Sequence, residues 1–361
     1  MSTRTNMQHG QRAVSNWILL GVIMLLIQVV LGGVTRLTGS GLSITEWDVV
    51  TGAIPPLNEQ QWLEEFAKYR QTNQFKTLNT SFTLDDFKFI FFWEWFHRFW
   101  ARLIGVAFIA GFVWLVGKRY LRAAMVKPLL ILFLLGALQG AIGWIMVASG
   151  LTGDAIYVKP TRLALHFIFA LLLVAYAFWF ALQLRIPYYD RIRAPRLQSR
   201  TFWLIALLVV QLTYGALMAG HKAANAAATW PDINGSYFPA GLWVKDHGLL
   251  NLVDNPITIH FVHRNLAYLL LVLIVVYTLQ VFRFKAGNRT LKRAAWWPLI
   301  LVVVQVALGI FSLLTAQYIV PNQWGRFEWM AQLHQVTGML LLLSLVAMLY
   351  LTRKPTYTQL S

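Results

Sequence analysis

Eight long apolar segments constrain the fold more than any other feature of this sequence. Each is a nearly uncharged run of about 20 residues, the length at which a helix crosses the hydrocarbon core of a bilayer. They lie at roughly 15–35, 88–116, 128–149, 162–184, 201–220, 257–281, 297–318 and 329–352. Because only 12% of the 361 residues are charged, we predict an all-α integral membrane protein with eight transmembrane helices.

The basic residues predict how these helices are oriented. They gather at the N-terminus, after the second, fourth and sixth segments, and in the C-terminal tail. By the positive-inside rule these parts, and with them both termini, are cytoplasmic. The net charge of +17 is therefore interpreted as a topology signal rather than as a nucleic-acid-binding surface.

The remaining composition narrows the chemistry. The chain has no cysteine, which excludes disulfides, zinc–thiolate sites, iron–sulfur clusters and covalent heme attachment. No small-residue cleavage site follows the first apolar segment, so that segment is predicted to be a retained span. Two long loops, about 36–87 and 221–256, lie on the other side of the membrane. Within the first, 59–69 is predicted to be either an interfacial helix or an ordinary solvated one.

Recurring polar residues indicate an internal repeat. The matched pairs are Gln28–Gln211, Gly32–Gly215 and Trp47–Trp230 at a spacing of 183 residues, then Glu94–His260, His97–His263, Arg98–Arg264, Gln139–Gln305 and Gly143–Gly309 at 166, and His166–His334 at 168. We predict two parallel four-helix halves, residues 1–184 and 201–352, joined by a cytoplasmic linker at 185–200. Such copies are related by an axis along the membrane normal.

The first, third, fifth and seventh segments share the pattern Gln-x-x-x-Gly. The four instances are Gln28–Gly32, Gln139–Gly143, Gln211–Gly215 and Gln305–Gly309. We prefer to interpret them as close helix packing with an interhelical hydrogen bond. Direct contact with a cofactor is the alternative.

Four histidines stand at matching depths in the even-numbered segments: His97, His166, His263 and His334. Within a four-helix unit, one histidine from each of two facing helices is a natural pair of axial ligands for a heme iron. His97 with His166 would make one site, and His263 with His334 the other. Zinc would require a further donor or an open water position, and a proton relay would not require this symmetry.

The two predicted sites differ one helical turn before the first histidine. The first has Glu94 there, and the second has His260. A carboxylate near a heme edge can stabilise positive charge on the porphyrin or move a proton. The alternative is that Glu94 merely pairs with Arg98 or Arg102. The asymmetry suggests that one heme is a retained cofactor and the other is worked upon.

An arginine follows the first histidine of each pair. Arg98 and Arg264 could meet heme propionates through charge-assisted hydrogen bonds near the outer surface. They could equally extend to the lipid headgroups.

At these residues the chain resembles the heme A synthase family, membrane enzymes that convert heme O to heme A. The likeness covers nearly the whole chain. It is strongest in Gly32-Gly33-Val34-Thr35-Arg36-Leu37-Thr38, Ser40-Gly41-Leu42-Ser43, Trp47, Pro55-Pro56-Leu57-Asn58 and Glu94-x-x-His97-Arg98, with His166, His263-Arg264 and His334 at the remaining histidine positions.

The resemblance implies a role for each half. The N-terminal half would hold the substrate heme at His97 and His166, with Glu94 catalytic, and the C-terminal half a heme b at His263 and His334. A porphyrin methyl group would be oxidised to a formyl group by successive hydroxylations and loss of water, which supplies the cofactor of cytochrome oxidase. Lacking cysteines, the chain resembles the branch of mitochondrial and alphaproteobacterial type. The second outer loop departs from the usual form of the family.

The resemblance also implies a setting. The chain is expected in a bacterial inner (plasma) membrane, with a mitochondrial inner membrane less favoured. Its partners would be the lipid bilayer, heme O, the heme O synthase that supplies it and an electron acceptor that the sequence does not name. A homo-oligomer is left open, and nucleic acid is not expected as a partner.

Two other functions remain as alternatives to heme A synthesis. One is a diheme b-type cytochrome that passes on electrons from quinol, and the other is a transporter built on the repeat.

Overall fold

The computed structural model describes residues 2–47, 51–320 and 323–355, and these residues form helices and loops without a strand. Eight of the described helices are long and apolar enough to cross a membrane, which confirms the eight predicted spans. They are α1 (Ser2–Leu37), α4 (Leu84–Gly117), α5 (Ala123–Ala148), α6 (Pro160–Arg185), α7 (Pro195–Gly220), α9 (Pro256–Arg283), α11 (Trp296–Thr315) and α12 (Arg326–Leu351). The shorter elements are η1 (Thr51–Ala53), α2 (Glu59–Tyr69), α3 (Asn73–Leu78), η2 (Tyr188–Asp190), η3 (Ala223–Ala226), η4 (Lys245–Leu250), α8 (Asn251–Asp254), α10 (Arg289–Ala294) and η5 (Ala316–Tyr318).

Several long helices begin before their predicted segments because polar residues cap them outside the apolar run. Thr83 and Asp86 form a reciprocal capping box at the start of α4. Asn255 accepts hydrogen bonds from the first backbone N–H groups of α9. At α12 the Glu328 carboxylate accepts from the Gly325 N–H at 2.8 Å. Hydropathy locates the part of a helix that lies within the membrane, whereas these caps determine the first residue of the helix.

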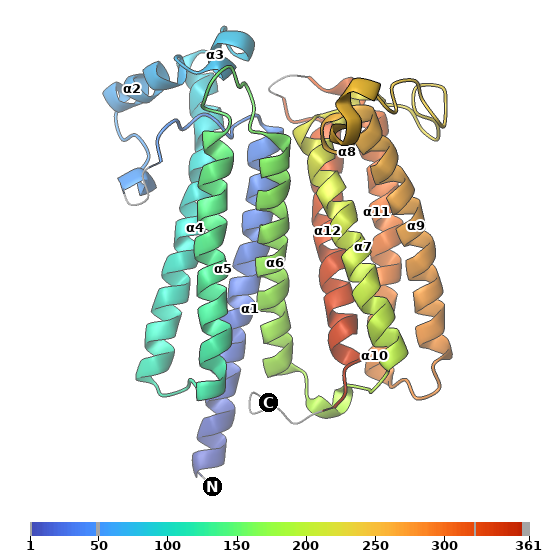
Figure 1. Ribbon diagram of the computed structural model, residues 1–361. Coiled ribbons are helices and arrows are strands. Elements are labelled where there is room, and N and C mark those ends of the chain that lie inside the picture. The colour runs from blue at the N-terminus through green and yellow to red at the C-terminus, as the bar shows by residue number, and fades with distance from the viewer. Residues whose placement is uncertain (1, 48–50, 321–322, 356–361) are drawn as a thin grey trace.

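The long helices form two groups of four (Figure 1). The first group, called the N-half here, contains α1, α4, α5 and α6; the second, the C-half, contains α7, α9, α11 and α12. The loops at 38–83 and 221–255 lie at one end of the bundle, which we call the long-loop end. Helix α1 begins and α12 ends at the opposite, short-loop end (Figure 1).

The halves meet through an exchange of helices. The first helix of each half packs on the last helix of the other, α1 on α12 and α7 on α6, and α6 also packs on α12. A rotation about an axis along the bundle would produce this arrangement, and the internal repeat stays a prediction.

Glutamine side chains fasten the α1–α12 contact. Gln332 and Gln335 of α12 donate hydrogen bonds to the carbonyl oxygens of Val30 (3.1 Å) and Val29 (2.9 Å) in α1. Gly33 lies beneath these amides, and a Cβ built there would overlap both of them. A small residue and interhelical hydrogen bonds are what hold helices together in lipid, where burial of apolar side chains gives little advantage.

The best-packed parts of the core lie along the contact between halves and toward the short-loop end. One buried cluster joins both halves and includes Leu171, Leu208, Ile274, Val302 and Leu342. A second closes the N-half near the α4–α5 turn and includes Val14, Leu115, Met125, Leu129 and Phe180.

The first long loop folds onto α4. The predicted helix at 59–69 is present as α2, and its apolar face packs on the start of α4 rather than facing a membrane surface or solvent alone. The ring centroids of Trp62 and Phe91 are 5.0 Å apart, and those of Phe66 and Phe87 are 5.1 Å apart. Tyr69 is fully buried in this cluster, and burial raises the pKa of its phenol to about 12.

Candidate functional site

Each of the four predicted ligand histidines lies against a glycine of a neighbouring helix. A Cβ built on the glycine would lie close to the imidazole: 3.3 Å from His97 for Gly32, 3.0 Å from His166 for Gly143, 3.3 Å from His263 for Gly215 and 2.9 Å from His334 for Gly309. A real methyl group at these distances would have to displace the ring. The glycines of the Gln-x-x-x-Gly pattern therefore make room for the histidines.

The glutamines of the same pattern form the interhelical hydrogen bonds that the sequence favoured. Three donate from Nε2 to the backbone carbonyl of the facing histidine: Gln28 to His97 (3.2 Å), Gln139 to His166 (3.0 Å) and Gln211 to His263 (3.0 Å). In the fourth pair the direction is reversed, since His334 Nδ1 donates to the Gln305 carbonyl at 3.0 Å.

The side-chain carbonyl oxygens of these glutamines accept no hydrogen bond from the described residues. The side-chain oxygens of Gln28, Gln139, Gln211 and Gln305 are buried, and none has a hydrogen-bond partner among the described residues. A buried polar atom without a partner is costly, so four at equivalent places indicate sites shaped for something further.

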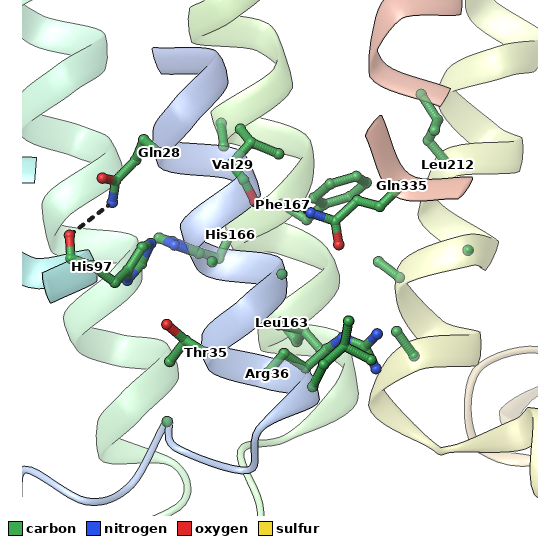
Figure 2. A pocket seen from close by; sticks show the side chains of 18 of the residues that line it. Gln28, Val29, Thr35, Arg36, His97, Leu163, His166, Phe167, Leu212 and Gln335 are labelled. Atoms are coloured by element: carbon green, nitrogen blue, oxygen red, sulfur yellow. Dashed lines mark hydrogen bonds between the residues drawn. The ribbon is translucent and has the colours of Figure 1, made fainter. Parts of the chain in front are cut away.

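The structure brings the predicted histidines together in pairs. Figure 2 shows His97 of α4 and His166 of α6 pointing toward each other beside α1. In the C-half, the ring centroids of His263 and His334 are 6.3 Å apart and the rings are inclined by 74°. All four line one cavity of about 1250 Å³, larger than the roughly 300–1,000 Å³ of ordinary ligand pockets.

This spacing fits a metal with two axial imidazoles. Metal–imidazole bonds are about 2 Å long, so with each ring centre roughly 1 Å further out, two opposed rings have centroids about 6 Å apart. No group of three or more metal-binding side chains occurs among the described residues. The pairs thus leave the other coordination positions to the ligand, as a porphyrin requires. The residues present fit heme.

Glu94 is buried, with 2% of its surface exposed, and it lines the cavity one turn from His97. Its Oε2 accepts hydrogen bonds from the Ser43 N–H (2.7 Å), the Ser43 hydroxyl (2.7 Å) and the Ile44 N–H (3.0 Å). Its Oε1 accepts from Arg98 Nη2 at 2.6 Å, so the pairing with Arg98 that the sequence allowed is present. Four donors around one carboxylate are the surroundings of a fixed negative charge.

Arg98 fastens residues 43–47, called the strap here, over the N-half site. Besides Glu94 it donates to the carbonyls of Ile44 (3.2 Å) and Glu46 (2.9 Å), and its guanidinium lies 4.8 Å from the Trp47 ring centroid. These contacts occupy much of its donor capacity. The propionate contact foreseen for Arg98 stays a prediction.

Arg264 does the same for the second long loop. It donates to the carbonyls of Thr229 (2.5 Å), Asp232 (2.6 Å) and Pro231 (3.3 Å), and only its Nε is buried without a partner in the described structure. Its propionate role likewise stays a prediction. Both arginines thus tie a loop that carries the matched tryptophan to the helix of the first ligand histidine.

His260 occupies the place that Glu94 has in the N-half, but its surroundings differ. It is 1% exposed and lines the cavity, yet neither ring nitrogen has a partner among the described residues. The loop histidine His221 instead contacts the Val253 carbonyl at 2.8 Å and does not line the cavity.

Three charged residues that received no role from the sequence also line the cavity: Arg36 of α1, Lys222 after α7 and Glu328 of α12. The Arg36 Nε is buried and has no partner in the described part of the chain. Its place at the end of the first apolar segment was the available signal, but extension of the side chain to the headgroups explains such an arginine equally well.

Comparison with known proteins agrees with this geometry. The family model described as "COX15-CtaA: Cytochrome oxidase assembly protein" matches residues 15–346. The chain belongs to this family. Proteins named heme A synthase are similar over most of their length. That of Rhodospirillum centenum is 42% identical over 345 residues, covering 95% of this chain and 89% of the relative. That of Methylobacterium nodulans is 44% identical over 324 residues, covering 88% and 86%. That of Paracoccus denitrificans is 41% identical over 310 residues, covering 84% and 81%.

Family membership connects the paired histidines with the chemistry named for these relatives. The match extends through both halves and includes all four histidines, Glu94 and both arginines.

Proposed function

We propose that this protein is a heme A synthase, which oxidises a methyl group of heme O to the formyl group of heme A. The observation that carries the proposal is the pair of matched histidine sites that differ at one buried position, Glu94 against His260. Family membership and the relatives' common name support the same conclusion.

Because of that difference, we assign a different heme to each pair of histidines. His97 and His166 would hold the iron of the substrate heme, and His263 and His334 that of a resident heme b. The resident heme, when bound, supplies one-electron transfer. Both pairs line the same cavity, so the two proposed sites would share one space within the membrane.

Glu94 acts in this scheme as a fixed charge rather than as a proton carrier. Hydrogen bonds from Ser43, Ile44 and Arg98 hold its carboxylate in one orientation, and the Arg98 guanidinium complements its charge. A preorganised negative charge stabilises positive charge that develops on the ring during oxidation, and such terms are among the largest in catalysis.

The diheme cytochrome alternative is not favoured. It assigns no chemistry to either heme and therefore gives no reason for a buried carboxylate at one site only. The relatives are named for heme A synthesis instead. We place the protein in a bacterial inner membrane, as its bacterial relatives suggest, with a heme O synthase as the supplier of its substrate.

Separate replacement of the histidines tests the assignment. We expect His263→Ala and His334→Ala to lose the resident heme b in a pyridine hemochrome assay on the purified protein. His97→Ala and His166→Ala should retain heme b but lose conversion of added heme O, followed by pigment chromatography. Loss of heme b from the N-half variants alone, or unchanged heme A formation by His97→Ala, would overturn the assignment.

A further inference from the structure

The two halves differ in how their second and third membrane helices meet. In the C-half, α9 and α11 pack directly against each other. In the N-half the equivalent helices α4 and α5, both described throughout, do not pack closely; α4 is held by α1, and α5 by α6. Packed helices lie about 8–10 Å apart, so α4 and α5 are separated by more than a packed pair.

Glycines line this separation. At Gly105 of α4, and at Gly136 and Gly140 of α5, no atom lies within 4 Å of the place where a Cβ would stand. All three are exposed, and all three line the cavity that contains His97 and His166. The cavity therefore reaches the side of the N-half between these two helices.

The C-half supplies an internal comparison. The repeat spacing of 166 places Leu271, Val302 and Val306 at the positions of the three glycines. Val302 is buried in the core that joins the halves, and Leu271 packs against the same core. The C-half thus carries branched side chains at the positions where the N-half has glycines, and Val302 and Val306 also line the cavity.

Aromatic side chains limit the opening toward the short-loop end. The rings of Phe108 on α4 and Phe133 on α5 stack with centroids 6.4 Å apart. Beyond them the N-half is closed by the buried cluster around Leu115, Met125 and Leu129. The opening is therefore confined to the part of the membrane that contains the N-half histidines.

We propose that the seam between α4 and α5, defined by Ala101, Gly105, Gly136 and Gly140, is the port through which the prenylated porphyrin passes from the lipid into the N-half. This inference rests on the proposed function. Each buried CH₂ of an alkyl chain favours the bilayer by about 0.8 kcal/mol, so a porphyrin with an isoprenoid tail resides in lipid and arrives from the side. A slot lined by glycines admits a flat ring between two helices. A retained heme b needs no such passage, in agreement with the closed C-half.

Transplanting the C-half residues tests the port. Full-length protein carrying Gly136→Val and Gly140→Val, with heme b bound, is reconstituted in liposomes and mixed with vesicles that contain heme O. Binding of heme O to His97 and His166 is followed by the change in heme absorption. We expect the rate of this change to fall at least tenfold, with the heme b content unchanged. Ala110→Val and Ala141→Val are the matched control, since they enlarge exposed positions of the same helices outside the cavity lining, and should leave the rate unchanged.

A reversible crosslink between α4 and α5 distinguishes closure of the seam from misfolding of the protein. Because the chain has no cysteine, Gly105→Cys and Gly136→Cys can be bridged across the seam by a bis-methanethiosulfonate reagent and released by a reductant. Uptake of heme O should fall at least tenfold in the bridged protein and recover after reduction of the same sample.

The outcomes distinguish two failures. Equal uptake rates in bridged and reduced protein would place the route elsewhere and overturn the port, while leaving substrate binding at the N-half intact. If wild-type protein takes up no heme O at His97 and His166, the proposed function fails, and the port fails with it.

Discussion

At the scale of single residues, one methyl group decides whether an imidazole can lie against the helix beside it. The four glycines opposite His97, His166, His263 and His334 leave space that alanine would fill. Overpacking of this kind costs about 1–3 kcal/mol when the neighbours cannot move freely. A histidine displaced in this way would no longer meet, at the correct angle, the iron that we propose it binds.

Gly309→Ala should weaken the binding of the proposed heme b in the C-half. The new methyl would lie 2.9 Å from His334, the tightest of the four contacts. We expect a roughly tenfold loss of heme b affinity, equivalent to about 1.4 kcal/mol, measured as transfer to an apo-heme-protein acceptor. Gly21→Ala is the control, because no atom lies within 4 Å of a Cβ there. Equal transfer from both variants would contradict a spacing role for this glycine.

Glu94→Gln should allow heme O to bind but not to be oxidised. The amide retains the size of the side chain and removes the charge, and losses of 10²–10³-fold are typical when a preorganised electrostatic partner is removed. We expect conversion to fall about 100-fold in pigment chromatography. Ser43→Ala, which removes one hydrogen bond from the carboxylate and preserves its charge, should stay within about threefold of wild type. The reverse order of effects would make Glu94 an anchor of the strap instead.

The sequence predicted part of this site and not the rest. The histidines follow from hydropathy and the repeat, and the Glu94–Arg98 pair follows because residues four apart are neighbours on a helix. The bonds from Ser43 and Ile44 to Glu94 do not follow, since they join α4 to a loop about 50 residues earlier that has no periodicity.

At the scale of helices, α1 serves both halves through two consecutive glycines. Gly32 faces His97 of its own half, while Gly33 receives Gln332 and Gln335 from α12. These glutamines flank His334, a proposed ligand of the other site. One turn of α1 thus positions both predicted heme sites.

Gly33→Val should therefore damage the site in the other half. The added side chain would overlap the Gln332 and Gln335 amides and push α12 away. We expect at least a fivefold drop in heme b retained at limiting heme, together with a lower thermal midpoint. Gly21→Val on the same helix serves as the comparison. Normal heme b retention in Gly33→Val would show that the α1–α12 contact does not position His334.

Acid should loosen the second long loop. The Gly235 N–H, which donates to the carboxylate at 2.9 Å, and the Thr229 side chain lower the pKa of Asp232 below its ordinary value of 3.8. The stability that this carboxylate adds is therefore present above pH 3.8 and lost as the pH falls through the lowered value. Protease cleavage within 221–255 should be constant from pH 7 to 5 and rise only in stronger acid. Asp232→Asn should remove that rise; a rise already present at pH 5 would contradict this cause.

The limits of sequence-based prediction also differ among elements. Apolar length identified α4, α5, α9 and α11 equally well, because each crosses the same bilayer. It could not show that α9 packs closely on α11 while α4 and α5 do not pack closely, since that depends on tertiary contacts between helices rather than on hydropathy.

At the scale of the whole molecule, the charge distribution predicts which end faces the cytoplasm. The connections at the short-loop end carry most of the basic residues, as the positive-inside rule requires of a cytoplasmic side. The cysteine-free chain permits a direct test with single introduced thiols.

Lys245→Cys in the second long loop should react with a membrane-impermeant maleimide in intact cells, and Lys285→Cys after α9 should react only after the cells are opened. Both positions are exposed at the protein surface, so access is decided by the membrane. Labelling in the opposite order would invert the proposed orientation without affecting the helix arrangement.

The gap between α4 and α5 has a consequence for how the protein withstands heat. Helices that pack along little of their length forgo dispersion energy that closely packed neighbours gain. In the N-half, α4 and α5 meet mainly near Phe108 and Phe133, whereas α9 and α11 of the C-half pack closely. The empty enzyme should thus begin to melt from its N-half, and a bound substrate would act as a wedge that completes the bundle. Turnover would then alternate between a looser and a firmer protein, with the firm state lasting only as long as the porphyrin stays.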